Sequence, residues 1–310
     1  MTPEGIMDSD DFPVEEELMS IIMHTASTGW KHDLGKKHID AWLANFTGEV
    51  FDLKYEKLMA LWLLSHFTFY NQDEVERLCK VVYQDLLHLL VTTQVNEARS
   101  PSQVINEFFA FTNIIPSEAV SGSGGFVAYL FRHVNNLPIH LFNYSIDNVS
   151  DRIKNLITID DVTLTAGTKG QMAVFLNKHH ARFKSKKIYL LTLVATEAAS
   201  EYLEKTFNVQ VVAAIRLDSR DKCFSDKSDI FSSFPTLIAP FRKFAEHYGK
   251  KIFAHPLGFE DGQYTFGFYY NAPDNSLPIF WSQVSGWIPV IKRHHKNYAS
   301  RRFLQDERFI

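Results

Sequence analysis

The feature that most constrains the fold is a regular alternation of apolar and amphipathic segments between residues 156 and 217. Apolar, β-branched runs predict strands at 156–162, 187–196 and 209–217, and the segments between them predict helices at 171–180 and 197–207. The connections are short, and strands that are apolar on both faces are typical of a parallel sheet covered by helices on both sides. The sequence therefore predicts an α/β core. A further strand is predicted at Leu137–Tyr144.

A segment of helical character precedes this core. Residues 15–94 show helical periodicity and contain no proline, so we expect an α-helical N-terminal module over residues 1–98. The sequence Arg99–Ser102 includes a proline that restricts the residue before it, which predicts a hinge there. Residues 99–310 would then form the α/β domain.

The parallel rhythm stops after Leu217, and residues from about 218 to 310 form an aromatic-rich C-terminal region. The pattern predicts a helix over 236–248 that ends at Gly249. It also predicts short β segments at 264–270 and 277–281. We expect this region to form a C-terminal β segment or hood within the α/β domain.

Composition excludes several classes of protein. The net charge of −4 gives no global electrostatic reason to bind nucleic acid, although such binding is not excluded. The two cysteines, Cys79 and Cys223, are too few for a disulfide framework and fit a reducing compartment. No apolar run approaches the roughly 18 residues of a membrane span, and the acidic N-terminus does not look like a signal peptide. We therefore expect a cytoplasmic protein without a membrane partner.

One stretch of the core carries residues suited to chemistry. Leu156–Gly170 reads LITIDDVTLTAGTKG, in which a buried strand ends at Asp160 and Asp161 and a loop of small residues leads into a helix. Backbone N–H groups of Thr165–Thr168 would face an anion at the positive end of the helix dipole. The carboxylates would lie where ribose hydroxyls or Mg²⁺ bind. The alternative is an ordinary β–α junction with a polar turn.

A second loop of small residues precedes the acidic strand. It comprises Ser121, Gly122, Ser123, Gly124 and Gly125, and a helical pattern begins directly after it at Phe126. A loop of this kind before a helix is also suited to an anion, although glycine and serine runs are often only flexible turns. Ligands of parallel sheets bind at the carboxyl ends of the strands, so the two loops can converge on one ligand.

The acidic stretch resembles the signature of type I phosphoribosyltransferases, which use phosphoribosyl pyrophosphate (PRPP). That signature consists, in order, of two acidic residues, a hydrophobic residue, two variable positions and the sequence Thr-Gly-x-Thr. The residues that fit are Asp160, Asp161, Val162, Thr165, Gly167 and Thr168, whereas Ala166 stands where the family usually has glycine. The sequences Asn271–Trp281 and Gly286–Pro289, and WLANF around Trp42, are similar to phosphoribosyltransferase-like proteins of bacterial conflict systems, the PRTase-CE type.

The resemblance implies roles for these residues. Asp160 and Asp161 would be catalytic, holding ribose hydroxyls and, directly or indirectly, Mg²⁺ as cofactor. The glycine- and serine-rich loop at 121–125 would cradle pyrophosphate. Phe280 and Trp281 are candidates for stacking on a base, with the hydrophobic core as the alternative. The 5′-phosphate would be held by Thr163, Leu164, Thr165, Ala166, Gly167 and Thr168.

The implied function is binding of PRPP or a related nucleotide, with phosphoribosyl transfer as an effector in bacterial antiviral defence. The unidentified base pocket and two departures from the family pattern motivate an alternative. If the loop needs a positive φ at residue 166, alanine there destabilises the loop by about 1 kcal/mol relative to glycine. The connection Ser145–Asn155 is also too short for the lid that many phosphoribosyltransferases close over ribose. The alternative is a catalytically inactive nucleotide-binding regulatory module that docks a partner protein or nucleoprotein through its helical N-terminal module. The basic segment Lys292–Arg302 could reach a phosphate or a partner, or could simply be solvated.

Overall fold

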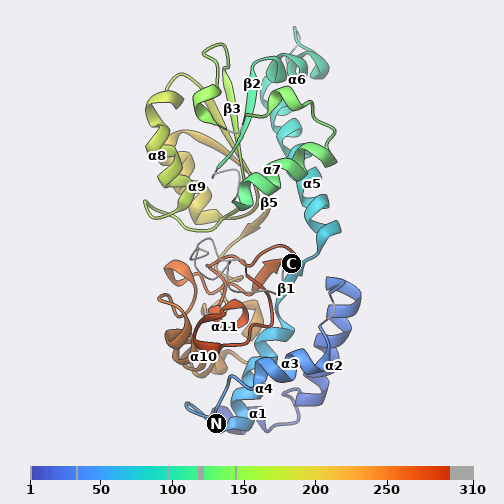
Figure 1. The fold of residues 1–310 in the computed structure, drawn as a ribbon, viewed down its shortest axis with the longest axis vertical. Helices are drawn as coiled ribbons and strands as arrows, with labels where there is room; N and C mark the ends of the chain where they lie inside the picture. Colours follow the sequence, from blue (N-terminus) through green and yellow to red (C-terminus); the bar gives the residue numbers. More distant parts are fainter. Residues whose placement is uncertain (1, 33, 97, 118–121, 144, 294–310) are drawn as a thin grey trace, which may run out of the picture.

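The protein is described from a computed structural model, which covers residues 2–32, 34–96, 98–117, 122–143 and 145–293. These residues form two lobes stacked along the long axis of the molecule (Figure 1). One lobe contains a four-stranded sheet, and the other contains the N-terminal helices together with the C-terminal third of the chain.

The sheet is parallel throughout, in the order β2-β3-β4-β5. Its strands are β2 (Thr112–Pro116), β3 (Asn155–Thr163), β4 (Lys187–Thr196) and β5 (Val209–Leu217). Five helices flank it: α5 (Gln72–Gln94), α6 (Pro101–Ala110), α7 (Ser123–Val134), α8 (Gln171–Phe183) and α9 (Glu197–Phe207). The predicted α/β fold with a parallel sheet is confirmed.

Helices cover both faces of this sheet. Alternate residues of a strand point to opposite sides, and because both sets are apolar here, both faces must be buried. Ile157 and Leu191 pack in one hydrophobic cluster with residues of α5, α6 and α7. Leu156 and Leu190 pack in another with residues of α8 and α9. The carboxyl ends of β3, β4 and β5 point toward the second lobe (Figure 1).

The second lobe joins segments from both ends of the chain. Its hydrophobic cluster combines residues between Met7 and Phe69 with residues between Cys223 and Ile291. A short parallel pair, β1 with β6, links the two segments. Its elements are α1 (Pro3–Met7), α2 (Glu15–Thr25), a π-helical turn (Ala26–Trp30), α3 (Lys36–Leu43), α4 (Leu53–Ser65), β1 (Thr68–Tyr70), α10 (Ile238–Ile252), β6 (Phe266–Phe268) and α11 (Pro278–Trp281).

The long helix α5 leaves this lobe and packs on the sheet of the other. Asn71 caps it, accepting from the backbone N–H of Glu74. The boundary near residue 98 stays a prediction. We call residues 218–293 the hood segment below.

Two predicted strands are wrong. Residues 137–143 contain a 3₁₀ turn at Ile139–Leu141 and a single bridge to β2, because Pro138 lacks an N–H and Ile139 lies exposed; Tyr144 lies outside the described residues. The segment 277–281 contains helix α11, whose first residue is Pro278, a position that suits proline.

Because residues 137–143 are not a strand of the sheet, the short connection Ser145–Asn155 no longer speaks against a lid. The sheet strand before β3 is β2, so the connection between them runs over residues 117–154 and includes α7. Gly249 also differs from its prediction: it lies inside α10, which continues to Ile252.

Among the described residues, no helix combines the length and hydropathy needed to cross a bilayer.

Both cysteines are buried, and we expect them to be inert in the folded protein. Burial raises the pKa of the Cys79 thiol from 9.0 to about 12, and it raises the pKa of Cys223 as well. At pH 8 Ellman's reagent should therefore react with both thiols only after the chain is unfolded in urea. Rapid labelling of one thiol without denaturant would contradict this.

The same pKa shifts of the two thiols predict how the stability of the fold depends on pH. The folded-state pKa of each thiol lies above its unfolded value, so deprotonation favours the unfolded chain. This contribution to stability is complete below about pH 9 and is lost as the pH rises toward 12.

Candidate functional site

The acidic pair ends strand β3, as expected. Asp160 and Asp161 are 2% and 5% exposed. The backbone N–H of Asp161 donates to Oδ1 of Asp160 over 2.9 Å, and the N–H of Val162 donates to Oδ1 of Asp161 over 2.9 Å. The strand's own backbone thus orients both carboxylates.

The glycine- and serine-rich loop meets the acidic pair through the first turn of α7. The Ser123 hydroxyl donates to Oδ1 of Asp161 over 3.1 Å. A Cβ on Gly124 would lie 2.9 Å from Ser117 Oγ and 3.2 Å from the carbonyl oxygen of Ile159, so glycine permits this close approach of α7 to β3.

This part of the loop is helical where the sequence predicted a turn. Helix α7 begins at Ser123 with Gly122 as its N-cap residue, so Gly124 and Gly125 also lie in the helix. Ser121 lies outside the described residues. The pyrophosphate role of this segment stays a prediction.

The hood segment contributes residues that the sequence analysis missed. The Tyr270 hydroxyl lies 3.5 Å from Oδ2 of Asp161. Burial raises the pKa of Tyr270 well above its ordinary value, and the charge of Asp161 adds to this, so the phenol stays protonated and can donate.

A buried arginine lies near the same carboxylate. Arg293 lies over the ring of Trp281 at 4.7 Å and pairs with Asp274 at 3.3 Å, and its side chain is only 11% exposed. Burial lowers the pKa of Arg293, whereas the charges of Asp274 and Asp161 act in the opposite direction. The sequence signal was the basic segment that begins at Lys292, but the solvated alternative does not hold for Arg293.

The loop after β3 has the closed shape that an anion site needs. A positive φ of 90° falls on Gly167, whereas Ala166 is not among the residues with positive φ, so alanine adds no backbone strain. A Cβ on Gly170 would lie 2.4 Å from the carbonyl oxygen of Thr165, so the turn closes only with glycine there. No side chain caps the N-terminus of α8 that follows, which leaves its N–H groups directed at the loop.

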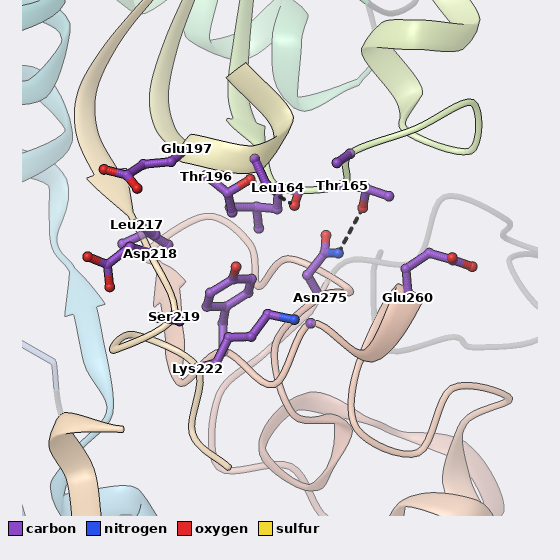
Figure 2. Close-up of a pocket in the computed structure, with 14 residues that line it drawn as sticks. Leu164, Thr165, Thr196, Glu197, Leu217, Asp218, Ser219, Lys222, Glu260 and Asn275 are labelled. Atoms are coloured by element: carbon purple, nitrogen blue, oxygen red, sulfur yellow. Dashed lines mark hydrogen bonds between the residues drawn. The ribbon is translucent and has the colours of Figure 1, made fainter. Parts of the chain in front are cut away.

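Two cavities flank this loop at the carboxyl edge of the sheet, with volumes of about 700 and about 230 Å³. Both are lined by Leu164, Thr165 and Asn275, so the loop is their common wall. Figure 2 shows the larger cavity. The larger one also reaches the ends of β4 and β5. The residues that line only this cavity are Ala166, Thr196, Glu197, Ala198, Leu217, Asp218, Ser219, Lys222, Glu260, Gly262 and Tyr264.

The wall of the larger cavity carries four charged side chains, Glu197, Asp218, Lys222 and Glu260, and two of them are in ion pairs. Asp218 pairs with Arg220 at 2.8 Å, and Glu260 pairs with Lys169 at 2.8 Å. Lys222 donates to the carbonyl oxygen of Asp261 over 3.1 Å and keeps its positive charge for the cavity, into which it points in Figure 2. The cavity therefore offers a cation beside the loop.

The prediction that Phe280 and Trp281 stack on a base is wrong. Both side chains are buried in the hydrophobic cluster of the second lobe. Phe280 stacks with Trp42 at 5.9 Å, and the indole N–H of Trp281 donates to the carbonyl oxygen of Ser276 over 3.0 Å. Neither ring presents a face to a ligand.

The carboxylates of Asp160 and Asp161 are hard oxygen ligands of the kind that Mg²⁺ prefers. Within the part of the chain that the structure describes, no group of three His, Cys, Asp or Glu side chains could hold a metal ion. Asp160 and Asp161 alone could supply only part of the coordination shell of a Mg²⁺ ion.

Residues 39–293 match the family described as PRTase-CE. Among solved structures, the chain is similar to orotate phosphoribosyltransferase from Aeropyrum pernix, with 20% identity and a TM-score of 0.26 over 43% of this chain and 70% of that one. No curated protein matches the sequence.

Proposed function

The chain belongs to the PRTase-CE family, the resemblance found in its sequence, and we propose that it binds PRPP or a related nucleotide and transfers its phosphoribosyl group. The observation that carries the proposal is the position of the loop at residues 163–168, between the acidic end of β3 and two cavities. An anion in this loop would sit at the N-terminus of α8.

The chemistry follows from these positions. The 5′-phosphate would bind the N–H groups and hydroxyls of Thr165–Thr168, and Asp160 and Asp161 would accept hydrogen bonds from ribose hydroxyls. In transfer, the bond from ribose C1 to pyrophosphate breaks, a bond from C1 to an acceptor forms, and pyrophosphate leaves. The buried carboxylates would stabilise the positive charge that develops on the sugar.

Mg²⁺, if bound here, would neutralise the charge of the leaving pyrophosphate. The residues that would hold it are Asp160 and Asp161. Ser123 and Tyr270 already donate to Asp161 and would keep this carboxylate oriented. Arg293, which pairs with Asp274, would balance part of the negative charge around Asp161.

We test the proposal by calorimetry and by turnover. The wild type should bind PRPP in the presence of Mg²⁺ and release pyrophosphate with at least one base of a panel. Asp161→Asn should weaken ribose 5-phosphate binding about tenfold, because it removes a charged hydrogen-bond acceptor. The control is Asp147→Asn, an exposed carboxylate that pairs with Arg182 in the last turn of α8; its affinity should equal that of the wild type. A wild type that binds no sugar phosphate or nucleotide would refute the proposal.

A second candidate is a nucleotide-binding regulatory module without turnover. Two of its three motives lose support, since Ala166 is unstrained and the short connection is not one between sheet strands. The third motive, the unidentified base pocket, stands, because Phe280 and Trp281 are buried in the core. The low exposure of Asp161, covered by Ser123 and Tyr270, favours it. Binding of PRPP without release of pyrophosphate from any acceptor would support this candidate.

Membership of the family also leads us to propose a cytoplasmic effector in bacterial antiviral defence, with a partner protein bound to the helical N-terminal module. The test is expression in a bacterium challenged with phage. Wild-type protein, with its neighbouring genes, should reduce plaque formation, and Asp161→Asn should not. Equal plaque counts with both proteins would remove this proposal.

A further inference from the structure

Asn275 joins the hood segment to the loop, although it lies in a stretch that reads as a turn. Its side-chain nitrogen donates to Oγ1 of Thr165 over 3.0 Å and to the carbonyl oxygen of Phe259 over 2.9 Å (Figure 2 shows the first bond). Because a carbonyl oxygen can only accept, the nitrogen must be the atom that faces Phe259. This fixes the orientation of the amide.

The backbone of Asn275 is also held in place. A Cβ on Gly258 or on Gly262 would lie 2.3 or 2.4 Å from the carbonyl oxygen of Asn275. The same oxygen accepts from the backbone N–H of Tyr264 over 3.2 Å. Asn275 is therefore buried at a fixed position rather than on a mobile turn.

The fixed amide determines what the Thr165 hydroxyl can do. Since Oγ1 accepts from Asn275, its proton is directed elsewhere, and no acceptor among the described residues engages it. The hydroxyl lies on the loop in which an anion would bind. It is thus prepared to donate to that anion.

The amide oxygen of Asn275 completes the arrangement. Among the described residues no donor engages this oxygen, and Asn275 lines both cavities. Figure 2 shows the oxygen beside the nitrogen, turned to the cavity. It would accept from a hydroxyl or amino group.

We propose that Asn275 is a ligand-binding residue: its N–H groups orient the Thr165 hydroxyl toward an anion in the loop, and its oxygen accepts from an O–H or N–H group of the same ligand. The ligand class is a phosphate ester with hydrogen-bond donors beyond the phosphate, such as a sugar phosphate or nucleotide. This inference rests on the proposed function of the loop.

A double-mutant cycle with two probes tests it. Inorganic phosphate, titrated by ³¹P NMR, occupies only the loop, so Asn275→Ala should weaken its binding about fivefold with Thr165 present and not at all in a Thr165→Ala background. Ribose 5-phosphate, titrated by calorimetry, also reaches the amide oxygen. In the Thr165→Ala background, adding Asn275→Ala should therefore still weaken the binding of ribose 5-phosphate about threefold.

Gln263 provides a matched control. It is another buried amide of the hood segment, bonded to the N–H of Phe224 and to Asp261, and it lines neither cavity. Gln263→Ala should lower the melting temperature and leave both affinities unchanged. A merely structural Asn275 would behave in the same way.

The outcomes separate the two proposals. A wild type that binds neither probe would overturn the proposed function and this inference together. Binding by the wild type with unchanged affinity in Asn275→Ala would overturn the role of Asn275 alone. So would an equal loss of phosphate affinity in both Thr165 backgrounds.

Discussion

Replacing Glu56 with alanine should lower the free energy of unfolding by about 4 kcal/mol. Glu56 is fully buried near the start of α4, and its two carboxyl oxygens accept four hydrogen bonds. Oε2 accepts from the N–H of Gly48 at 2.7 Å and from the Tyr248 hydroxyl at 2.5 Å. Oε1 accepts from the N–H groups of Val50 at 2.7 Å and Phe51 at 3.2 Å.

Alanine would leave the backbone N–H groups of Gly48, Val50 and Phe51 without this acceptor, and it would remove the bond by which α4 holds Tyr248 of α10. Urea unfolding, followed by tryptophan fluorescence and circular dichroism, measures the loss. Glu49→Gln is the control, because Glu49 lies in the same turn but is exposed, paired with Lys251 and His247; it should change stability far less. Equal stabilities of the Glu56 and Glu49 variants would show that the buried network contributes little.

The part of the fold that could be predicted is the part that local pattern determines. β4, α9 and β5 have the predicted bounds because each is a continuous run whose pattern, apolar in the strands and amphipathic in the helix, changes at its ends. The acidic end of β3 was predictable for the same reason.

Short apolar runs were not predictable by pattern. Residues 137–144 and 277–281 contain alternating or continuous apolar residues that suit a strand, a buried helix or a turn equally well. In both, a proline decides against a sheet strand: Pro138 precedes the 3₁₀ turn and Pro278 begins α11. The first segment led to the prediction that the connection after it is too short for a lid. The second contains the two residues that were candidates for stacking on a base.

The residues that the hood segment contributes to the site are placed there by contacts between positions far apart in the chain. Asn275 lies 110 residues from Thr165, and Tyr270 lies 109 residues from Asp161. Both come from stretches whose composition indicates only turns and packed aromatics. The carboxyl edge of the sheet could be predicted to hold a ligand, but the side chains that face it from the hood could not.

Gly249→Ala should also destabilise the protein strongly, by about 3 kcal/mol. An alanine inside a helix is normally about 1 kcal/mol better than glycine. Here the sign reverses, because the chain after α10 folds back over its last turns. A Cβ on Gly249 would lie 2.0 Å from the carbonyl oxygen of Pro256 and 2.9 Å from its Cα.

Gly29→Ala is the matched control for this substitution. Gly29 lies in the π-helical turn Ala26–Trp30, and a Cβ there would meet only Thr25 Cγ2 at 3.8 Å. It should leave stability unchanged or raise it slightly, because alanine restricts the unfolded chain without a clash. Thermal unfolding of the two variants beside the wild type makes the comparison. If Gly249→Ala melts at or above the wild-type temperature, then residues 253–256 can move away from α10, and the close packing of the hood segment against that helix does not determine stability.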